Sequence, residues 1–228
     1  MGGGASSSRI AANHQQARKE GDAVPDVTIK VRVRVADGEE VSAFAWKDFP
    51  ISELFKGKRV VVFSIPGAFT PVCSCDHLPS YIKHYDEILK MGIDDVYCIS
   101  VNDAFVMRQW GLAQGLTEHK TLNDPNNKSP LNPGNFTTIK LIPDGAAKFT
   151  RAMGMTCRWE NIGGFGERSW RYSAVFNDMK IEKLFLEEDG NIEDDAEHGP
   201  EPFEVSGGTT MIEYLSQAKP SAPATPQQ

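Results

Sequence analysis

The chain has 228 residues, a formal net charge of −7 and 24 % charged residues, values that fit one α/β domain with additional tails. The acidic balance argues against a nucleic-acid partner, because such binding needs clustered Lys and Arg. No apolar run approaches the roughly 18 residues of a membrane span, and no apolar signal-peptide core opens the chain, so we expect a cytoplasmic protein.

The N-terminal segment, residues 1–22, is rich in Gly, Ser, Ala, Gln and Arg and has no apolar period. It therefore predicts a flexible arm. Gly2 and Ser6 match the N-myristoylation pattern, which would give weak, reversible membrane contact; the alternative is a plain disordered tail. A second flexible tail is predicted at residues 219–228, which leaves residues 23–218 as the folded domain.

The first predicted strand covers residues 27–35, where apolar and polar side chains alternate. This pattern indicates a half-buried strand, and its positive positions, Lys30, Arg32 and Arg34, are interpreted as the solvent face. A turn, a loop and then a short helix at residues 51–55 are expected to follow.

Two continuous apolar runs, residues 59–65 and 95–100, predict strands that are buried on both faces, as in a covered and mostly parallel sheet. A further strand is predicted at residues 138–142, and a hairpin at residues 173–177 and 181–186. Helices are expected between and after these strands, at about residues 74–91, 103–114, 146–153 and 209–217. The pattern indicates an α/β fold with a thioredoxin-like mixed sheet flanked by helices.

Two long loops are predicted, at residues 116–135 and 187–201. The second is acidic, but it lacks the spaced ligand pattern of a calcium loop, so its carboxylates are expected to be solvated.

The cysteines are too few and too irregularly spaced for a disulfide scaffold. They are Cys73, Cys75, Cys98 and Cys157. A zinc site is also not expected, because the chain offers only one close thiol pair, with His77 nearby. Reactive thiol chemistry is the remaining interpretation.

Cys73 directly precedes a predicted helix and follows a buried strand. The positive end of a helix stabilises a thiolate over a thiol. Thr70 can place a hydroxyl beside the sulfur, and Pro66 and Pro71 restrict the approach loop. Such a pocket suits a small polar oxidant; the alternative is a small buried thiol packed under a helix.

Residues 66–74, with the sequence PGAFTPVCS, resemble the active-site signature of the peroxiredoxins, specifically the type 5 (plant type II) branch. Residues 98–107, 143–150 and 168–173 resemble further segments of that family, so that the resemblance covers about residues 22–217. The chain is also similar to the peroxiredoxin part of bacterial peroxiredoxin–glutaredoxin hybrids. The resemblance implies a thiol peroxidase that reduces hydrogen peroxide and alkyl hydroperoxides through a cysteine sulfenic acid, without a cofactor.

The resemblance also implies the roles of four residues. Cys73 is the expected attacking cysteine, and Pro66, Thr70 and Arg171 complete its site. Arg171 would hold the thiolate charge and polarise the peroxide as the O–O bond breaks, unless it forms a surface ion pair. Arg168 is expected to be structural.

Regeneration of the sulfenic acid needs a second thiol. Cys98 stands at the strand position where plant type II members carry a proposed resolving cysteine, but it can equally be a buried core thiol. Cys75 is expected to be a bystander or a minor resolver, and Cys157, in a predicted loop, to be inert or glutathionylated. An external thiol, either glutathione with glutaredoxin or thioredoxin, is the expected reductant, and the resemblance implies a homodimer.

His77 and His84 lie seven positions apart on the predicted helix and are expected to be ordinary helix residues rather than a general base. An alternative function is a peroxide-sensing switch or a chaperone-like interaction protein that uses the same cysteine.

Overall fold

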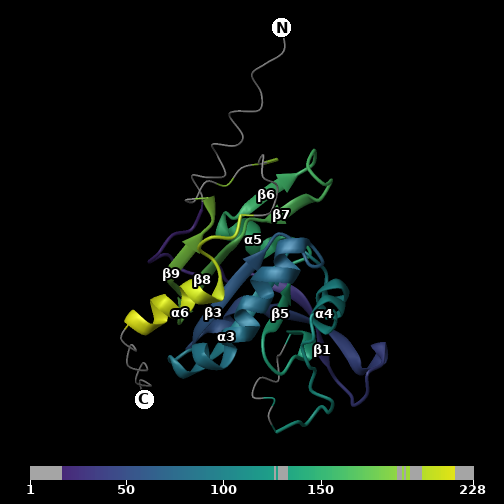
Figure 1. Cartoon of the computed structure of the whole chain (residues 1–228). Helices are drawn as coiled ribbons and strands as arrows, with labels where there is room; N and C mark the ends of the chain where they lie inside the picture. Colours follow the sequence, from purple (N-terminus) through teal and green to yellow (C-terminus); the bar gives the residue numbers. More distant parts are fainter. Residues whose placement is uncertain are drawn as a thin grey trace.

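The computed structural model describes residues 17–125, 127, 133–188, 192, 194–195 and 202–218. Its centre is a five-stranded mixed sheet with helices on both faces (Figure 1). The strands, in spatial order, are β5 (Lys140–Pro143), β4 (Asp95–Ser100), β3 (Arg59–Ile65), β8 (Tyr172–Asn177) and β9 (Lys180–Leu186). β3, β4 and β5 are parallel, whereas β8 is antiparallel to β3 and to β9. The predicted sheet is therefore confirmed.

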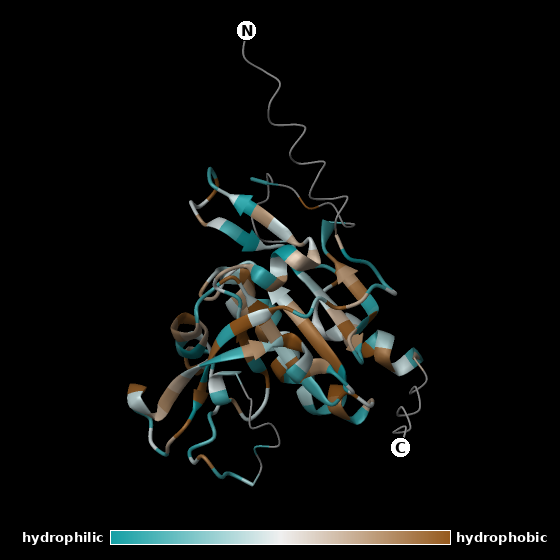
Figure 2. Ribbon diagram, turned by 180° about the vertical axis from the view of Figure 1, so that it is seen from behind, coloured by the Kyte–Doolittle hydropathy of each residue, from teal (hydrophilic) through white to brown (hydrophobic). Residues whose placement is uncertain are grey.

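β3 forms the middle of the core because all seven of its residues are buried. Its side chains alternate between two hydrophobic clusters, with Val60 and Val62 on one face and Val61, Phe63 and Ile65 on the other. Figure 2 shows strands coloured as hydrophobic in the centre of the fold.

The helices divide between the two faces. The face of Val61 is covered by α3 (Leu78–Lys90), α4 (Ala104–Ala113) and α6 (Gly208–Gln217). The face of Val60 is covered by the short α2 (Ile51–Phe55) and α5 (Lys148–Met153). Two 3₁₀ turns, η1 (Val41–Ala43) and η3 (Pro133–Asn135), complete the connections. No described helix is long and apolar enough to cross a membrane.

A hairpin of β1 (Thr28–Arg34) and β2 (Phe44–Pro50) lies outside the central sheet, and β2 replaces part of the predicted loop. The prediction that Arg32 and Arg34 face solvent is wrong, because both are buried. Arg32 donates to the carbonyl oxygens of Val41 and Phe44, at 2.6 and 2.9 Å. Both guanidinium groups also lie over the Phe44 ring, and these contacts offset the burial of their charge.

A second hairpin, β6 (Thr156–Trp159) and β7 (Gly166–Ser169), occupies the region that was predicted as a loop around Cys157. Two residues of the acidic loop hold this hairpin and are not simply solvated. Asp194 accepts a hydrogen bond from the Arg158 N–H at 2.8 Å, and Asp195 accepts one from the Asn161 N–H at 2.8 Å.

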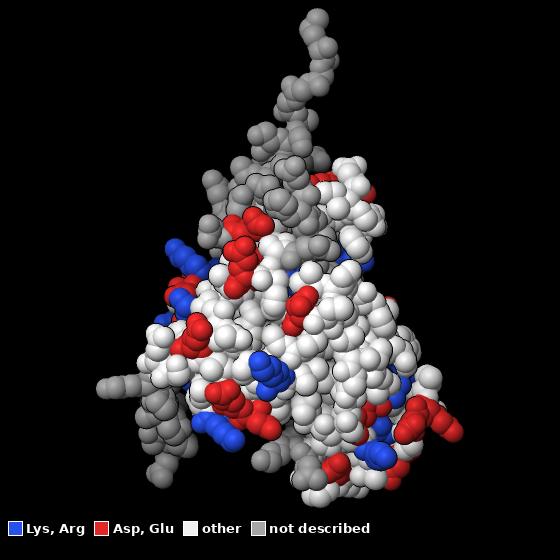
Figure 3. Space-filling model, in the orientation of Figure 1, with Lys and Arg blue, Asp and Glu red and all other residues white. Residues whose placement is uncertain are grey.

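The described part of the predicted N-terminal arm contacts the domain. The backbone N–H of Arg18 donates to Met153 O at 2.9 Å, and that of Gly21 donates to Ile181 O at 2.8 Å. The folded part therefore begins before residue 23. Gly2 and residues 219–228 lie outside the described residues. On the face shown in Figure 3, acidic and basic side chains are interspersed.

Candidate active site

The loop that follows β3 is held in one conformation by short hydrogen bonds. The Ala68 N–H donates to Asn102 Oδ1 at 2.9 Å, and the Thr70 hydroxyl donates to Gly67 O at 2.8 Å. Phe69 has a left-handed φ of 65° and is 58 % exposed, a conformation that costs a non-glycine residue energy and is kept only where neighbouring contacts enforce it. The loop delivers the chain to Cys73, and Pro66 at its start is buried.

Cys73 is fully buried and is the first residue of η2 (Cys73–His77), a π-helical turn. The predicted continuous helix at 74–91 is thus divided into this turn and α3. Pro79 contributes to the division, because it lacks the N–H that would continue the α-helical ladder. Next to Cys73, the Ser74 N–H donates to Thr70 O at 3.1 Å and the Ser74 hydroxyl accepts from Trp110 Nε1 at 3.0 Å. π-Turns of this kind are rare and are frequent at functional sites.

Arg171 reaches Cys73 because of the sheet topology. β8 runs antiparallel to β3 and pairs Tyr172 with Ser64, so the residue before β8 lies beside the end of β3. Arg171 is 1 % exposed, and its Nη1 donates to Cys73 Sγ at 3.4 Å. The structure thus brings together two of the residues that the sequence assigned to the site. A guanidinium at this distance favours a negatively charged sulfur.

His77 is the residue that the sequence interpretation missed. It is fully buried, its Nδ1 lies 3.1 Å from Arg171 Nη1, and its Nε2 lies 3.1 Å from Ser206 O. Burial, and then the charge of Arg171, hold the pKa of His77 well below its usual value. A neutral imidazole between these two groups accepts from Arg171 at Nδ1 and donates from Nε2 to the carbonyl.

The expectation that His77 is an ordinary helix residue is therefore wrong, whereas it holds for His84, which lies 3.2 Å from Glu87 near the surface. The sequence carried one usable signal: His77 follows Cys73 by four positions, the spacing that puts two helical residues on one face.

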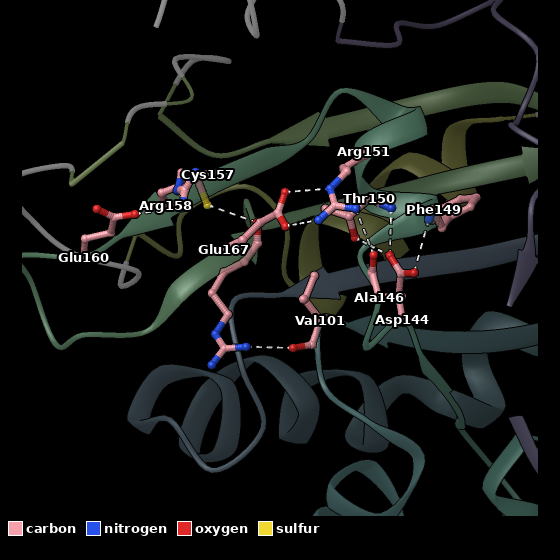
Figure 4. Close-up of polar contacts among 11 residues, drawn as sticks. Val101, Asp144, Ala146, Phe149, Thr150, Arg151, Cys157, Arg158, Glu160 and Glu167 are labelled. Carbon is pink, nitrogen blue, oxygen red and sulfur yellow. Dashed lines mark hydrogen bonds and ion pairs between the residues drawn. The ribbon is translucent and has the colours of Figure 1, made fainter. Parts of the chain in front are cut away.

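Arg168 has the structural role that was expected. It lies on β7 and its Nη1 donates to Val101 O at 2.8 Å, which ties the hairpin to the loop after β4. Figure 4 shows Asp144, whose carboxylate accepts from the backbone of Phe149 and Thr150 and so caps α5.

The other cysteines are all free thiols. Cys98 is buried on β4, in register with Phe63, and burial raises its pKa well above the usual value; the neighbouring Cys73 raises it further. Cys157 is buried on β6, and its pKa is also raised, mainly by burial. Cys75 is exposed. No group of three or more His, Cys, Asp or Glu side chains suited to a metal ion occurs among the described residues.

The chain is similar to known proteins over most of its length. The family described as Redoxin matches residues 19–198. Peroxiredoxin sll1621 of Synechocystis is 43 % identical over 197 residues, which are 86 % of this chain and 90 % of the relative. The hybrid peroxiredoxin hyPrx5 of Haemophilus influenzae is 40 % identical over 86 % of this chain and 66 % of its own length.

The crystal structure of reduced Prx3 from Vibrio vulnificus in complex with H₂O₂ superposes with a TM-score of 0.63, at 31 % identity, over 87 % of this chain and 99 % of that one. Together with the buried Cys73–Arg171 pair, these similarities show that the chain belongs to the peroxiredoxin family of thiol peroxidases.

Proposed function

We propose that this protein reduces hydrogen peroxide and small alkyl hydroperoxides at Cys73, and that glutathione with glutaredoxin, or thioredoxin, restores the thiol. The contact of 3.4 Å between Arg171 Nη1 and Cys73 Sγ carries the proposal. Because the cysteine is fully buried, small oxidants fit the site better than bulky ones.

The proposed reaction is a nucleophilic displacement on oxygen. The Cys73 thiolate attacks one peroxide oxygen, an S–O bond forms, and the O–O bond breaks. The leaving oxygen takes up a proton and departs as water or an alcohol, while the sulfur is oxidised to a sulfenic acid. Negative charge moves from sulfur to the leaving oxygen. In this proposal the Arg171 guanidinium stabilises the charge on both atoms.

Thr70 and Pro66 are proposed to shape the pocket. The Thr70 hydroxyl lies in the loop directly before Cys73, and its bond to Gly67 O leaves its oxygen able to accept a hydrogen bond from the O–H of a bound peroxide.

An external thiol is the proposed resolving group. A thiol attacks the sulfenic acid, water leaves, and a mixed disulfide forms that a second thiol reduces. Cys98 is a poor internal candidate, because a thiol with a raised pKa is mostly protonated and therefore a weak nucleophile. Cys75 is exposed but lies two residues from Cys73, where a disulfide would be strained.

Peroxide consumption tests the proposal directly. We expect turnover with glutathione and glutaredoxin or with thioredoxin and its reductase, loss of turnover in Cys73→Ser, and retained turnover in Cys75→Ser, which removes the adjacent exposed thiol. Oxidation of one equivalent of protein without turnover by any of these reductants would instead favour a redox switch.

We also propose a homodimer. Two aromatic side chains that follow the carboxyl ends of β3 and β4 are exposed, Phe69 at 58 % and Phe105 at 46 %. Exposed apolar groups favour contact with a partner. Sedimentation velocity tests this proposal, and a monomer at micromolar concentration would contradict it.

A further inference from the structure

The segment before α6 touches the active site through one carbonyl group. Ser206 is fully buried, and its carbonyl oxygen accepts two hydrogen bonds, from His77 Nε2 at 3.1 Å and from the Tyr81 hydroxyl at 2.9 Å. Phe203, in the same segment, lies against the His77 ring with 5.0 Å between centroids. The position of this segment therefore sets the orientation of His77.

Glu187 holds that segment in place. It follows β9 and is 1 % exposed. Its Oε1 accepts hydrogen bonds from the Ser206 N–H at 2.8 Å, the Ser206 hydroxyl at 2.6 Å and the Val205 N–H at 3.1 Å, and its Oε2 accepts one from the Glu204 N–H at 2.9 Å. Four donors to one buried carboxylate are what such a group needs in order to offset the loss of water.

The backbone of Glu187 is in turn joined to the segment that carries Arg171. The Glu187 N–H donates to Arg171 O at 3.3 Å, and Trp170 Nε1 donates to Glu187 O at 3.2 Å. These contacts therefore form a closed cycle of four residues. Glu187 fixes Ser206, Ser206 orients His77, His77 accepts from the Arg171 guanidinium, and the Arg171 backbone accepts from Glu187.

We propose that Glu187 is a positioning residue for the reaction at Cys73. By holding residues 204–206, it places the Ser206 carbonyl so that His77 keeps its proton on Nε2 and presents Nδ1 to Arg171. The guanidinium is thereby kept on the sulfur. This inference rests on the proposed function only in assigning Cys73 as the reacting residue.

The physical reason is that a neutral imidazole can face a guanidinium in two ways. With its acceptor nitrogen forward it binds Arg171, whereas with its N–H forward it opposes a donor with a donor and forces the two apart. The Ser206 carbonyl accepts only and therefore selects the first arrangement. Among the described residues, the charged and titratable groups that face this cluster are Arg171, Cys73, Cys98, Tyr81 and Glu187.

Glu187→Gln tests the inference with little change in volume. The amide retains one acceptor oxygen, but its NH₂ group replaces the other and opposes a backbone N–H. We expect the rate of Cys73 alkylation by iodoacetamide to shift to higher pH by about one unit, and the second-order rate with hydrogen peroxide at pH 7 to fall about tenfold. Both rates are measured in a protein that carries Cys75→Ser, Cys98→Ser and Cys157→Ser together, so that only Cys73 reacts.

Glu182→Gln is the matched control. Glu182 lies on the same strand β9, and its carboxylate accepts from Arg59, Asn177 and Tyr214, with no contact to the Cys73 cluster among the described residues. This variant is expected to lose thermal stability but to keep the alkylation profile. A purely structural role for Glu187 predicts that both variants lose thermal stability and that both keep the alkylation profile. That result would overturn the inference.

Ser206→Ala provides a second measurement if Glu187→Gln does not fold. It removes the hydroxyl donor at 2.6 Å but keeps the carbonyl, so a smaller shift in the same direction is expected. An unchanged profile would again overturn the inference. If the wild type consumes no peroxide with any reductant, the proposed function fails, but the alkylation profiles still decide the role of Glu187.

Discussion

Replacing His77 by Leu should remove a specific pH dependence of stability. In the folded protein the side chain is buried and its pKa lies well below 6.5, whereas in the unfolded chain it titrates near 6.5. Below that pH the unfolded state binds a proton that the folded state does not, so the wild type loses stability as the pH falls. The loss is at most about 1.4 kcal/mol per pH unit, which sets an upper bound of about 2 kcal/mol at pH 5.

The same substitution also has a cost at neutral pH. It removes the acceptor for Arg171 Nη1 and one donor to Ser206 O. Loss of a hydrogen bond to a charged group costs about 1.5–3 kcal/mol, and Ser206 O keeps the Tyr81 hydroxyl as a donor. His77→Leu is thus expected to be about 2–3 kcal/mol less stable than the wild type at pH 7.5, and this difference should shrink, by up to about 2 kcal/mol, as the pH falls to 5.

Urea unfolding at five pH values between 5 and 7.5 measures this difference. The contributions of the carboxylates cancel between wild type and variant. The change with pH in the difference between their free energies of unfolding therefore reports His77. His84→Leu is the control, because His84 lies on α3 near the surface beside Glu87, and its loss should cost less than about 0.5 kcal/mol. If the difference in free energy of unfolding between wild type and His77→Leu is constant with pH, a buried neutral imidazole at position 77 is refuted.

Three further predictions concern other parts of the molecule. Arg171→Lys should lower the stopped-flow rate with hydrogen peroxide by about 10²- to 10³-fold, whereas Arg168→Lys, which alters the bond to Val101 O, should lower it less than about fivefold; equal losses would contradict the assignment of roles. Cys98→Ser should keep turnover with glutathione and glutaredoxin and lose about 1–2 kcal/mol of stability, and loss of turnover would instead identify Cys98 as the resolving thiol. Asp103→Ala removes the cap that accepts from the Phe105 and Val106 N–H groups, and guanidinium unfolding should show a loss of about 1 kcal/mol; an unchanged midpoint would contradict it.

The parts of the fold that could be predicted from the sequence are those whose signal is local. β3 and β4 are uninterrupted apolar runs, and all of their residues are buried. Asp103 stands directly before an apolar helix and caps it. In each case burial or capping depends on neighbouring residues, which the sequence shows directly.

The parts that could not be predicted depend on contacts between distant residues. β2 has only Phe44 and Phe49 buried, so it has no alternating pattern. Arg32 and Arg34 alternate as a solvent face would, yet an aromatic ring and loop carbonyls cover them. Periodicity records polarity but does not show what packs on top.

The candidate site divides in the same way. Cys73 and its loop could be assigned from a contiguous motif, and Arg171 from a second motif. The support of the Arg171 guanidinium comes from His77 and Ser206, which lie 129 positions apart. No spacing rule connects such residues, so the contact becomes visible only in the folded chain.

Peptide mapping by mass spectrometry after one equivalent of hydrogen peroxide identifies the cysteine that the oxidant attacks. We expect the added oxygen on Cys73 alone, and we expect glutathione to convert the same residue into a mixed disulfide. Oxidation that appears first on Cys75, Cys98 or Cys157, with Cys73 unmodified, would contradict it.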